Sequence, residues 1–163
     1  MKKRTDIKNL AYRLGKKLIS TNKTISTAES CTGGMIAKFI TDIPGSSKYF
    51  KGGIVSYSND AKVKILGVDN KLLEKHGAVS KDVAIAMVKG VQKLMQTDFA
   101  VAVTGIAGPD GGTYKKPVGL VYIAAAYGDE VTVKRFSFYS NRDLNRRLTT
   151  FNALKMVFEK TEE

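Results

Sequence analysis

The sequence predicts an α/β domain of three layers, an α/β/α sandwich with helices on both faces of a mixed β-sheet. Helical and β-prone segments alternate early in the chain, an order typical of strands joined by helices. The segment 99–103, Phe-Ala-Val-Ala-Val, is apolar throughout, as a central strand covered on both faces would be. Because 163 residues suit one hydrophobic core, we predict a single domain over residues 1–163.

The predicted elements follow one another in a regular order. They are helix 5–20, strand 24–28, helix 35–40, strand 53–57, helix 60–66, helix 70–76, a helix that begins after Ser80, strand 99–103, strand 118–126, strand 130–138 and a C-terminal helix. No internal repeat, linker or low-complexity segment interrupts this order. The pattern α-β-α-β-α-α-α-β-β-β-α therefore predicts one mixed sheet rather than two domains.

The helices are predicted from apolar residues that recur three or four positions apart. These residues are Ile7, Leu10, Ala11, Leu14 and Leu18 in the first helix, Val83, Met87, Val91 and Leu94 in the helix after Ser80, and Leu144, Leu148, Phe151, Leu154 and Phe158 in the last. Ser80 is a favourable N-cap, and Pro44-Gly45 and Gly77 are signals that end the helices before them.

The strands are predicted from short β-prone runs. The segments 24–28 and 53–57 are of this kind. The segments 118–126 and 130–138 are separated only by Tyr-Gly-Asp at 127–129, which predicts a hairpin. The second of these strands alternates polar and apolar residues, as a partly exposed strand should.

The composition narrows the class of protein. The net charge is +12, but the basic residues are spread along the chain without an arm or interleaved aromatics, so nucleic-acid binding is unlikely to be the function. No apolar run approaches the roughly 20 residues of a membrane span, and the N-terminus lacks a secretory signal. We therefore expect a cytoplasmic protein without a membrane partner.

Cysteine and histidine are almost absent. The single cysteine, Cys31, excludes an internal disulfide and suits a reducing compartment. With His76 as the only histidine, a zinc site of Cys and His ligands is excluded as well. A metal held by carboxylates alone stays open, but no clustered Asp/Glu motif indicates one, and we expect no metal or cofactor.

Two Gly-rich segments, 27–34 and 103–112, carry most of the functional information. Each follows a predicted buried strand and turns into a loop or helix start. An α/β protein exposes backbone N–H groups and short hydroxyl side chains to ligands at such places. The two segments together predict an enzyme pocket for an anionic or phosphorylated small molecule.

The same segments resemble the CinA C-terminal domain family. The resemblance runs from the first helix to the last, through the motifs at 27–34, 43–47, 57–62, 76–80, 104–112 and 116–119. Family members act as nicotinamide-nucleotide amidohydrolases, which cleave nicotinamide mononucleotide (NMN) to nicotinate mononucleotide and ammonia. Some carry an additional N-terminal domain similar to molybdopterin-binding proteins. This chain is too short for that domain, so the resemblance implies a stand-alone deamidase, and family habit suggests a homodimer.

Amide hydrolysis needs a nucleophile and a base. His76 precedes Gly77 at a predicted helix C-terminus, where a capping role explains it, so a Ser-His-Asp triad is disfavoured and a Ser-Lys pair remains. The resemblance implies Lys62 as the base, although a lysine on a short helix is usually a solvated surface residue. Ser47 is the preferred nucleophile, because a loop and a strand could return the chain to the same pocket. Ser30 is its rival, assigned to substrate or oxyanion binding.

Other residues are expected to bind the substrate or to have a structural role. The hydroxyl of Thr104 is expected to meet the pocket and, with Ser30 and backbone amides, to stabilise the oxyanion, and Gly105 permits close approach of the backbone. Gly33 and Gly108 belong to the two Gly-rich segments, and the backbone amides of 108–112 are suited to wrap the ribose or phosphate, although ordinary surface turns have the same composition. Three side chains have two alternative roles each. Tyr57 stacks on the nicotinamide or packs in the core, and Cys31 is a reactive thiol or a small buried residue. Arg146 matches an arginine of the family on the last helix, so the resemblance implies a phosphate clamp, with a solvated helix arginine as the alternative.

The chain departs from the family pattern before the last helix. Where relatives often have Gly-Asp-Arg before the last helix, this chain has Ser140-Asn141-Arg142, which removes a carboxylate and leaves the role of Arg142 undefined. The alternative functions are a non-catalytic binding module associated with competence or DNA damage, and an amidase for another amide.

Overall fold

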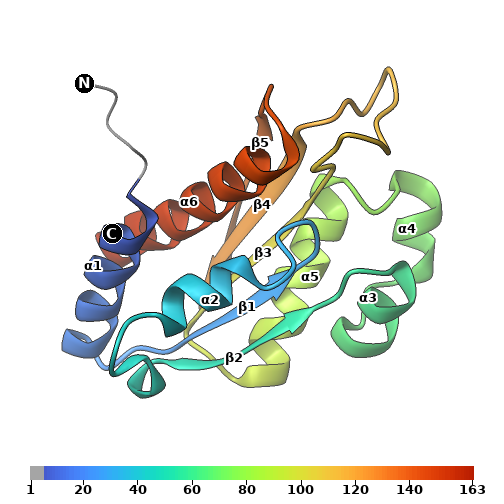
Figure 1. Cartoon of the computed structure of the whole chain (residues 1–163). Helices are drawn as coiled ribbons and strands as arrows, with labels where there is room; N and C mark the ends of the chain where they lie inside the picture. Colours follow the sequence, from blue (N-terminus) through green and yellow to red (C-terminus); the bar gives the residue numbers. More distant parts are fainter. Residues whose placement is uncertain (1–5) are drawn as a thin grey trace.

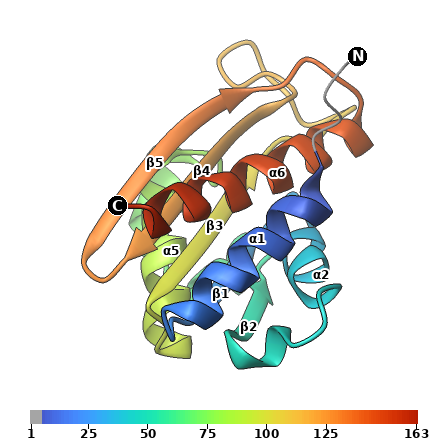
Figure 2. The same ribbon diagram turned by 90° about the vertical axis from the view of Figure 1, so that its left-hand side faces the viewer.

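The computed structural model describes residues 6–163 and has helices on both faces of a five-stranded sheet (Figure 1). One face carries α1 (Ile7–Ser20), α2 (Met35–Thr41) and α6 (Arg142–Thr161). The other face carries α3 (Asn59–Leu66), α4 (Asn70–His76) and α5 (Lys81–Met95). Figure 2 shows α1 and α6 lying side by side over the sheet. The predicted three-layer α/β fold is therefore confirmed.

The sheet is mixed, and its strand order is β2-β1-β3-β4-β5. Its strands are β1 (Ile25–Glu29), β2 (Phe50–Val55), β3 (Phe99–Gly105), β4 (Leu120–Tyr127) and β5 (Glu130–Ser137). Strand β1 runs parallel to β2 and β3, whereas β4 is antiparallel to both β3 and β5. The carboxyl ends of β1, β2 and β3 consequently lie at the same end of the sheet. Ligands bind at this end in open α/β sheets.

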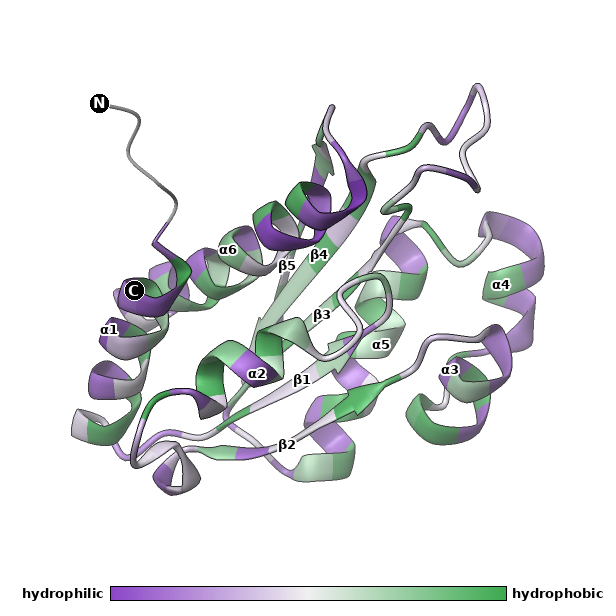
Figure 3. Ribbon diagram, in the orientation of Figure 1, coloured by the Kyte–Doolittle hydropathy of each residue, from purple (hydrophilic) through white to green (hydrophobic). Residues whose placement is uncertain are grey.

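Two hydrophobic cores fill the spaces between the layers. In β3, Val101 and Val103 face the core under α1, α2 and α6, and Ala100 and Ala102 face the core under α5. The prediction that this strand is covered on both faces is confirmed. Figure 3 shows mainly hydrophobic colours along β3 and β4 and alternating hydrophobic and hydrophilic residues along α1 and α6.

The order of elements agrees with the prediction, and a 3₁₀ turn at Ser46–Lys48 (η1) is added before β2. Strand β2 begins three residues earlier than predicted and ends at Val55, so Tyr57 lies outside it. The strand gives way to a helix soon after Val55, because Ser58 caps α3 by accepting from Ala61 N. The predicted start of the first helix at residue 5 lies outside the described residues.

The apolar face predicted for the last helix is wrong at its first position. Leu144 is exposed, and α6 instead buries a face that begins at Asn145 and continues through Thr149 and Leu154. The reason is that the Asn145 amide donates to the carbonyls of Ala107 and Ser140, which turns this polar residue inward. Leu94, predicted on the apolar face of α5, is also exposed.

None of the helices between residues 6 and 163 combines the length and apolar character needed to cross a lipid bilayer.

Candidate functional site

The candidate site lies at the carboxyl ends of three parallel strands, where a loop leaves each of them. Residues 30–34 follow β1, residues 56–58 follow β2, and residues 106–119 follow β3. Ser30 N donates to Val103 O at 3.1 Å and Ser56 N donates to Glu29 O at 2.9 Å. These bonds hold the starts of the first two loops beside β3 and β1.

Glu29 fixes the first loop from inside the protein. Its carboxylate is 1% exposed and accepts from Thr32 Oγ1 at 2.6 Å, Ile36 N at 2.8 Å and Ala37 N at 3.0 Å. The carboxylate thereby satisfies two orphan N–H groups at the start of α2. The sharp turn of this loop also needs Gly33 and Gly34, whose φ angles are +59° and +99°.

Glu29→Gln is expected to lower the free energy of unfolding by about 2 kcal/mol, because an amide presents one acceptor oxygen where the carboxylate presents two. The measurement is the urea midpoint at neutral pH. Glu74→Gln, the same change on the exposed side of α4, is the matched control and is expected to leave the midpoint unchanged. Equal midpoints for the two variants would contradict the role given to Glu29.

Lys62 is buried between the loops that follow β1 and β2. Its side chain enters from α3, is 1% exposed, and its Nζ donates to Ser30 Oγ at 3.1 Å, to Ser56 O at 2.8 Å and to Tyr57 O at 3.4 Å. Burial lowers the pKa of Lys62 below its ordinary value, because the interior disfavours the ammonium. Lys62 is therefore not the solvated surface lysine that its short helix suggests.

Ser30 is the hydroxyl that the structure brings to this lysine. The backbone around it offers donors as well, because the amides of Thr32 and Gly34 donate to no group among residues 6–163. A serine hydroxyl, a lysine amine and free amides within one loop are the parts from which a Ser-Lys hydrolase site is built.

Ser47 is not brought to Lys62. It lies exposed in η1, before the start of β2, while Lys62 follows the end of β2. In Figure 1, α3 lies beyond the arrowhead of β2 and the 3₁₀ turn precedes its tail. Six residues of strand, about 20 Å, separate the two ends. The expectation that the chain returns Ser47 to the pocket of Lys62 is not met within one copy of the chain.

Arg146 reaches the first loop from α6. Its Nε donates to Cys31 O at 3.1 Å and its Nη2 donates to Thr32 O at 2.8 Å. The guanidinium therefore holds carbonyls of the loop, a role that the predicted phosphate clamp did not include. Gly33 lies against it, since a Cβ there would come within 3.4 Å of Arg146 Nη2.

Thr104 lies at the predicted place but its hydroxyl is engaged. The side chain is buried at the end of β3 and Oγ1 donates to Ala78 O at 2.8 Å. A hydroxyl has one proton to donate, so Thr104 in this state cannot donate to an oxyanion. Gly105 ends the strand next to it, and a Cβ there would lie 2.6 Å from Val121 Cγ2, so glycine is required for packing against β4.

Arg142 links the other two loops. Its Nη1 donates to Gly108 O at 2.7 Å and its Nη2 donates to Tyr57 Oη at 3.2 Å. The Tyr57 side chain is 60% exposed at the mouth of the site, so it does not pack in the core. Asn141 caps α6 by accepting from Leu144 N at 2.9 Å, so the change from aspartate preserves the cap.

Cys31 and His76 have structural surroundings. Cys31 is buried, and burial raises its pKa to about 12, so its thiol stays protonated. His76 ends α4, and its Nδ1 lies 3.8 Å from the Asp82 carboxylate. Between residues 6 and 163 no group of three or more His, Cys, Asp or Glu side chains is placed to hold a metal ion.

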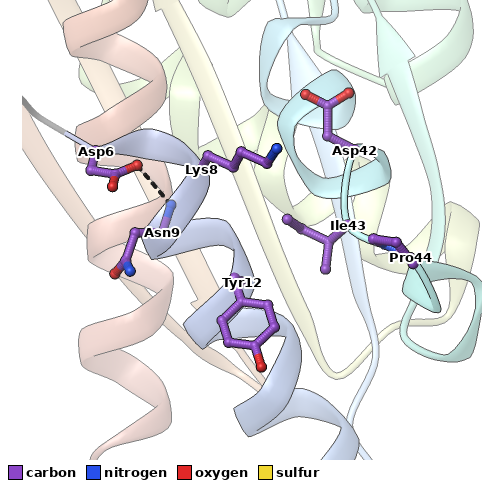
Figure 4. A pocket seen from close by; sticks show the side chains of 7 residues that line it. All are labelled: Asp6, Lys8, Asn9, Tyr12, Asp42, Ile43 and Pro44. Carbon is purple, nitrogen blue, oxygen red and sulfur yellow. Dashed lines mark hydrogen bonds between the residues drawn. The ribbon is translucent and has the colours of Figure 1, made fainter.

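A hollow of about 650 Å³ lies elsewhere, between α1 and the loop after α2 (Figure 4). It is lined by Asp6, Lys8, Asn9, Tyr12, Asp42, Ile43 and Pro44, none of them a predicted site residue. Its acidic groups are engaged, since Asp6 accepts from Asn9 N and Asp42 is paired with Lys38. This hollow therefore does not belong to the Ser30–Lys62 site.

The sequence reasoning missed Glu29 and left Arg142 without a role. The available signal for Glu29 was its position between the predicted strand 24–28 and Ser30, where a carboxylate that becomes buried needs hydrogen-bond partners. No local pattern indicates that Arg142 spans to Gly108 and Tyr57, which are distant in the sequence.

Comparison with known proteins gives a consistent result. The family model of the CinA C-terminal domain matches residues 7–161. A putative competence-damage inducible protein of Acetivibrio thermocellus is 54% identical over 153 residues, which are 94% of this chain and 37% of that protein. A CinA-like protein of Geotalea uraniireducens is 56% identical over 134 residues, 82% of this chain and 32% of that protein. The chain thus spans about a third of the length of these curated relatives.

Solved structures of CinA proteins have the same fold as this chain. The competence/damage inducible protein CihA of Agrobacterium tumefaciens superposes with a TM-score of 0.94 at 41% identity, covering 97% of this chain and 96% of that one. A CinA superfamily protein of Escherichia coli superposes with a TM-score of 0.92 at 31% identity, covering 97% of this chain and 92% of that one. From its first described helix to its last, this chain belongs to the CinA family as a CinA C-terminal domain.

Proposed function

We propose that this protein is a nicotinamide-nucleotide amidohydrolase that converts NMN to nicotinate mononucleotide and ammonia, with Ser30 as nucleophile and Lys62 as base. The observation that carries the proposal is the 3.1 Å hydrogen bond between Lys62 Nζ and Ser30 Oγ, at a lysine that is 1% exposed. The substrate follows from the resemblance of the sequence motifs to those of NMN deamidases. A cytoplasmic location and a homodimer stay predictions.

The reaction begins with neutral Lys62. It takes the proton of Ser30 as the serine oxygen bonds to the carboxamide carbon, and the carbonyl oxygen becomes an oxyanion. The amides of Thr32 and Gly34 lie in the loop that directly follows the nucleophile and donate to no group among residues 6–163, and we assign the oxyanion to them instead of to Thr104.

Collapse of the tetrahedral intermediate breaks the carbon–nitrogen bond. The Lys62 ammonium gives its proton to the departing amide nitrogen, which leaves as ammonia. A water then attacks the acyl ester with Lys62 again as base, the ester bond breaks, and Ser30 recovers its proton. The product is the carboxylate, so no oxidant, metal or cofactor enters the balance.

The pyridinium ring of the substrate assists this chemistry. A positive charge beside Lys62 lowers the pKa of the amine further, and the ring makes the attached carboxamide more electrophilic. Tyr57 lies at the mouth of the site with an exposed ring, which is suited to stack on the pyridinium.

The rate of NMN hydrolysis is expected to rise with pH, because only neutral Lys62 accepts the proton of Ser30. Burial lowers the pKa of this lysine, so the midpoint of the rise lies below the ordinary lysine value of 10.5. The measurement is kcat/KM for ammonia release between pH 5.5 and 10. A rate that falls across this range, or that is flat, would contradict Lys62 as the base.

The direct test is ammonia release from NMN by the purified chain, with free nicotinamide as control substrate. Release from NMN alone supports the proposed reaction and a requirement for the ribose phosphate. No release from a protein shown to be folded by circular dichroism would overturn the proposal, and would leave another amide substrate or a non-catalytic binding module as the function.

A further inference from the structure

Two arginines of α6 face the site without an acidic partner. Arg142 and Arg146 are four residues apart, so they lie on the same side of the helix. All their hydrogen-bond partners are neutral oxygens, and neither forms an ion pair with an acid among residues 6–163. Arg147, in contrast, is paired with Asp143 at 2.8 Å. The first turns of α6 therefore present two uncompensated positive charges to the site.

The two arginines differ in how firmly they are held. Arg146 is half-buried, and its bonds to the carbonyls of Cys31 and Thr32 support the loop that carries Ser30. Arg142 is exposed, and its two bonds use one N–H on each terminal nitrogen. A guanidinium has five N–H groups, so three on Arg142 remain for a ligand.

A single residue, Tyr57, connects Arg142 to the Ser30–Lys62 pair. Tyr57 accepts from Arg142 with its hydroxyl and from Lys62 with its backbone carbonyl. A small molecule whose carboxamide lies at Ser30 and whose ring lies on Tyr57 would therefore bring its far end to Arg142.

We propose that Arg142 is the specificity-determining residue that binds the anionic group of the substrate, while Arg146 positions the nucleophile loop. The proposal rests on the amidohydrolase function above. A planar, permanently charged guanidinium suits a phosphate monoester, because two parallel N–H groups can donate to two phosphate oxygens. Asn141 caps the helix with a neutral side chain, so no neighbouring carboxylate at this position neutralises Arg142.

The test compares two substrates that differ only in the phosphate. For Arg142→Gln, kcat/KM for NMN is expected to fall by about 100-fold, mainly through KM, because charge-assisted bonds to the phosphate are lost. For nicotinamide riboside, which lacks the phosphate, the change is expected to stay within about threefold. Arg142→Lys keeps the charge without the paired donors and is expected to give an intermediate loss on NMN.

Arg147→Gln is the matched control, since it removes an exposed arginine from the same helix that is already paired with an acid. It is expected to leave both substrates unaffected. Equal losses on NMN and the riboside for Arg142→Gln would overturn the proposal and make Arg142 a residue that only positions Tyr57. An unchanged KM for NMN would also overturn it.

A binding measurement separates this proposal from the reaction itself. Wild type and Arg142→Gln are titrated with ribose 5-phosphate and with ribose by calorimetry. Binding of ribose 5-phosphate that is at least about tenfold weaker in the variant supports Arg142 even if the wild type releases no ammonia from NMN. Equal binding by both proteins overturns the assignment of Arg142 even if NMN is hydrolysed.

Discussion

Replacing Ser30 with alanine is expected to lower kcat/KM for NMN by about 10³-fold or more, because among residues 6–163 Ser30 supplies the hydroxyl that is hydrogen-bonded to Lys62. The loss should appear in kcat, since the serine oxygen bonds to the substrate only in the transition state and the acyl intermediate. The measurement is ammonia release at substrate saturation. A mass spectrum after quenching should show the acyl adduct on the wild type and none on Ser30→Ala.

Ser47→Ala is the matched control for this experiment. Ser47 is exposed in η1, at the opposite end of β2 from Lys62, and its loss is expected to leave kcat and KM unchanged. Loss of activity in Ser47→Ala together with normal activity in Ser30→Ala would reject the assignment made here.

Replacing Lys62 with methionine is expected to lower kcat/KM by a similar factor, about 10³-fold or more, because the variant has neither base nor acid at Ser30. Methionine preserves most of the buried volume, so the protein should remain folded. Lys64→Met is the matched control. Lys64 lies on the same helix, is exposed and forms only a surface pair with Asp60. Activity that survives in folded Lys62→Met would exclude the Ser-Lys mechanism.

The same variant tests the burial of the lysine by its effect on stability. The pKa of Lys62 is lowered in the folded protein, so the unfolded chain binds more protons at this residue between the two pKa values. Burial of Lys62 therefore opposes folding fully below the folded pKa, and this cost disappears as the pH rises to 10.5. The stability of Lys62→Met relative to wild type should accordingly increase as the pH falls from 10 to 7, as urea unfolding would show. A difference that is independent of pH would contradict the lowered pKa.

Most of the fold was predictable because it is encoded locally. Apolar spacing and caps such as Ser80 mark the helices, and the uninterrupted apolar run of β3 marks the centre of the sheet. The errors lie where tertiary contacts override this pattern. Leu144 has the apolar spacing, but hydrogen bonds of Asn145 to two carbonyls decide which side of α6 is buried.

The sequence predicted which segments form the candidate site better than it predicted the role of each residue. The two Gly-rich segments and Lys62 do meet at the carboxyl ends of the parallel strands. The preference for Ser47 overlooked that a strand runs from one end of the sheet to the other, so residues just before and just after β2 do not share a pocket within one copy of the chain. Bonds such as those from Arg146 to Cys31 and Thr32 span more than a hundred positions, and no local spacing predicts them.

The buried thiol of Cys31 has a consequence for chemical probes of this protein. Iodoacetamide and maleimides react with thiolates, and a thiol with a pKa of about 12 supplies almost none at neutral pH. Boronates and fluorophosphonates instead react with an activated serine oxygen, and the proposed mechanism assigns that role to Ser30, one residue earlier. The choice of reagent is thus expected to distinguish Ser30 from Cys31, and under the proposed mechanism covalent inhibitors of this protein should carry a group that reacts with serine oxygen.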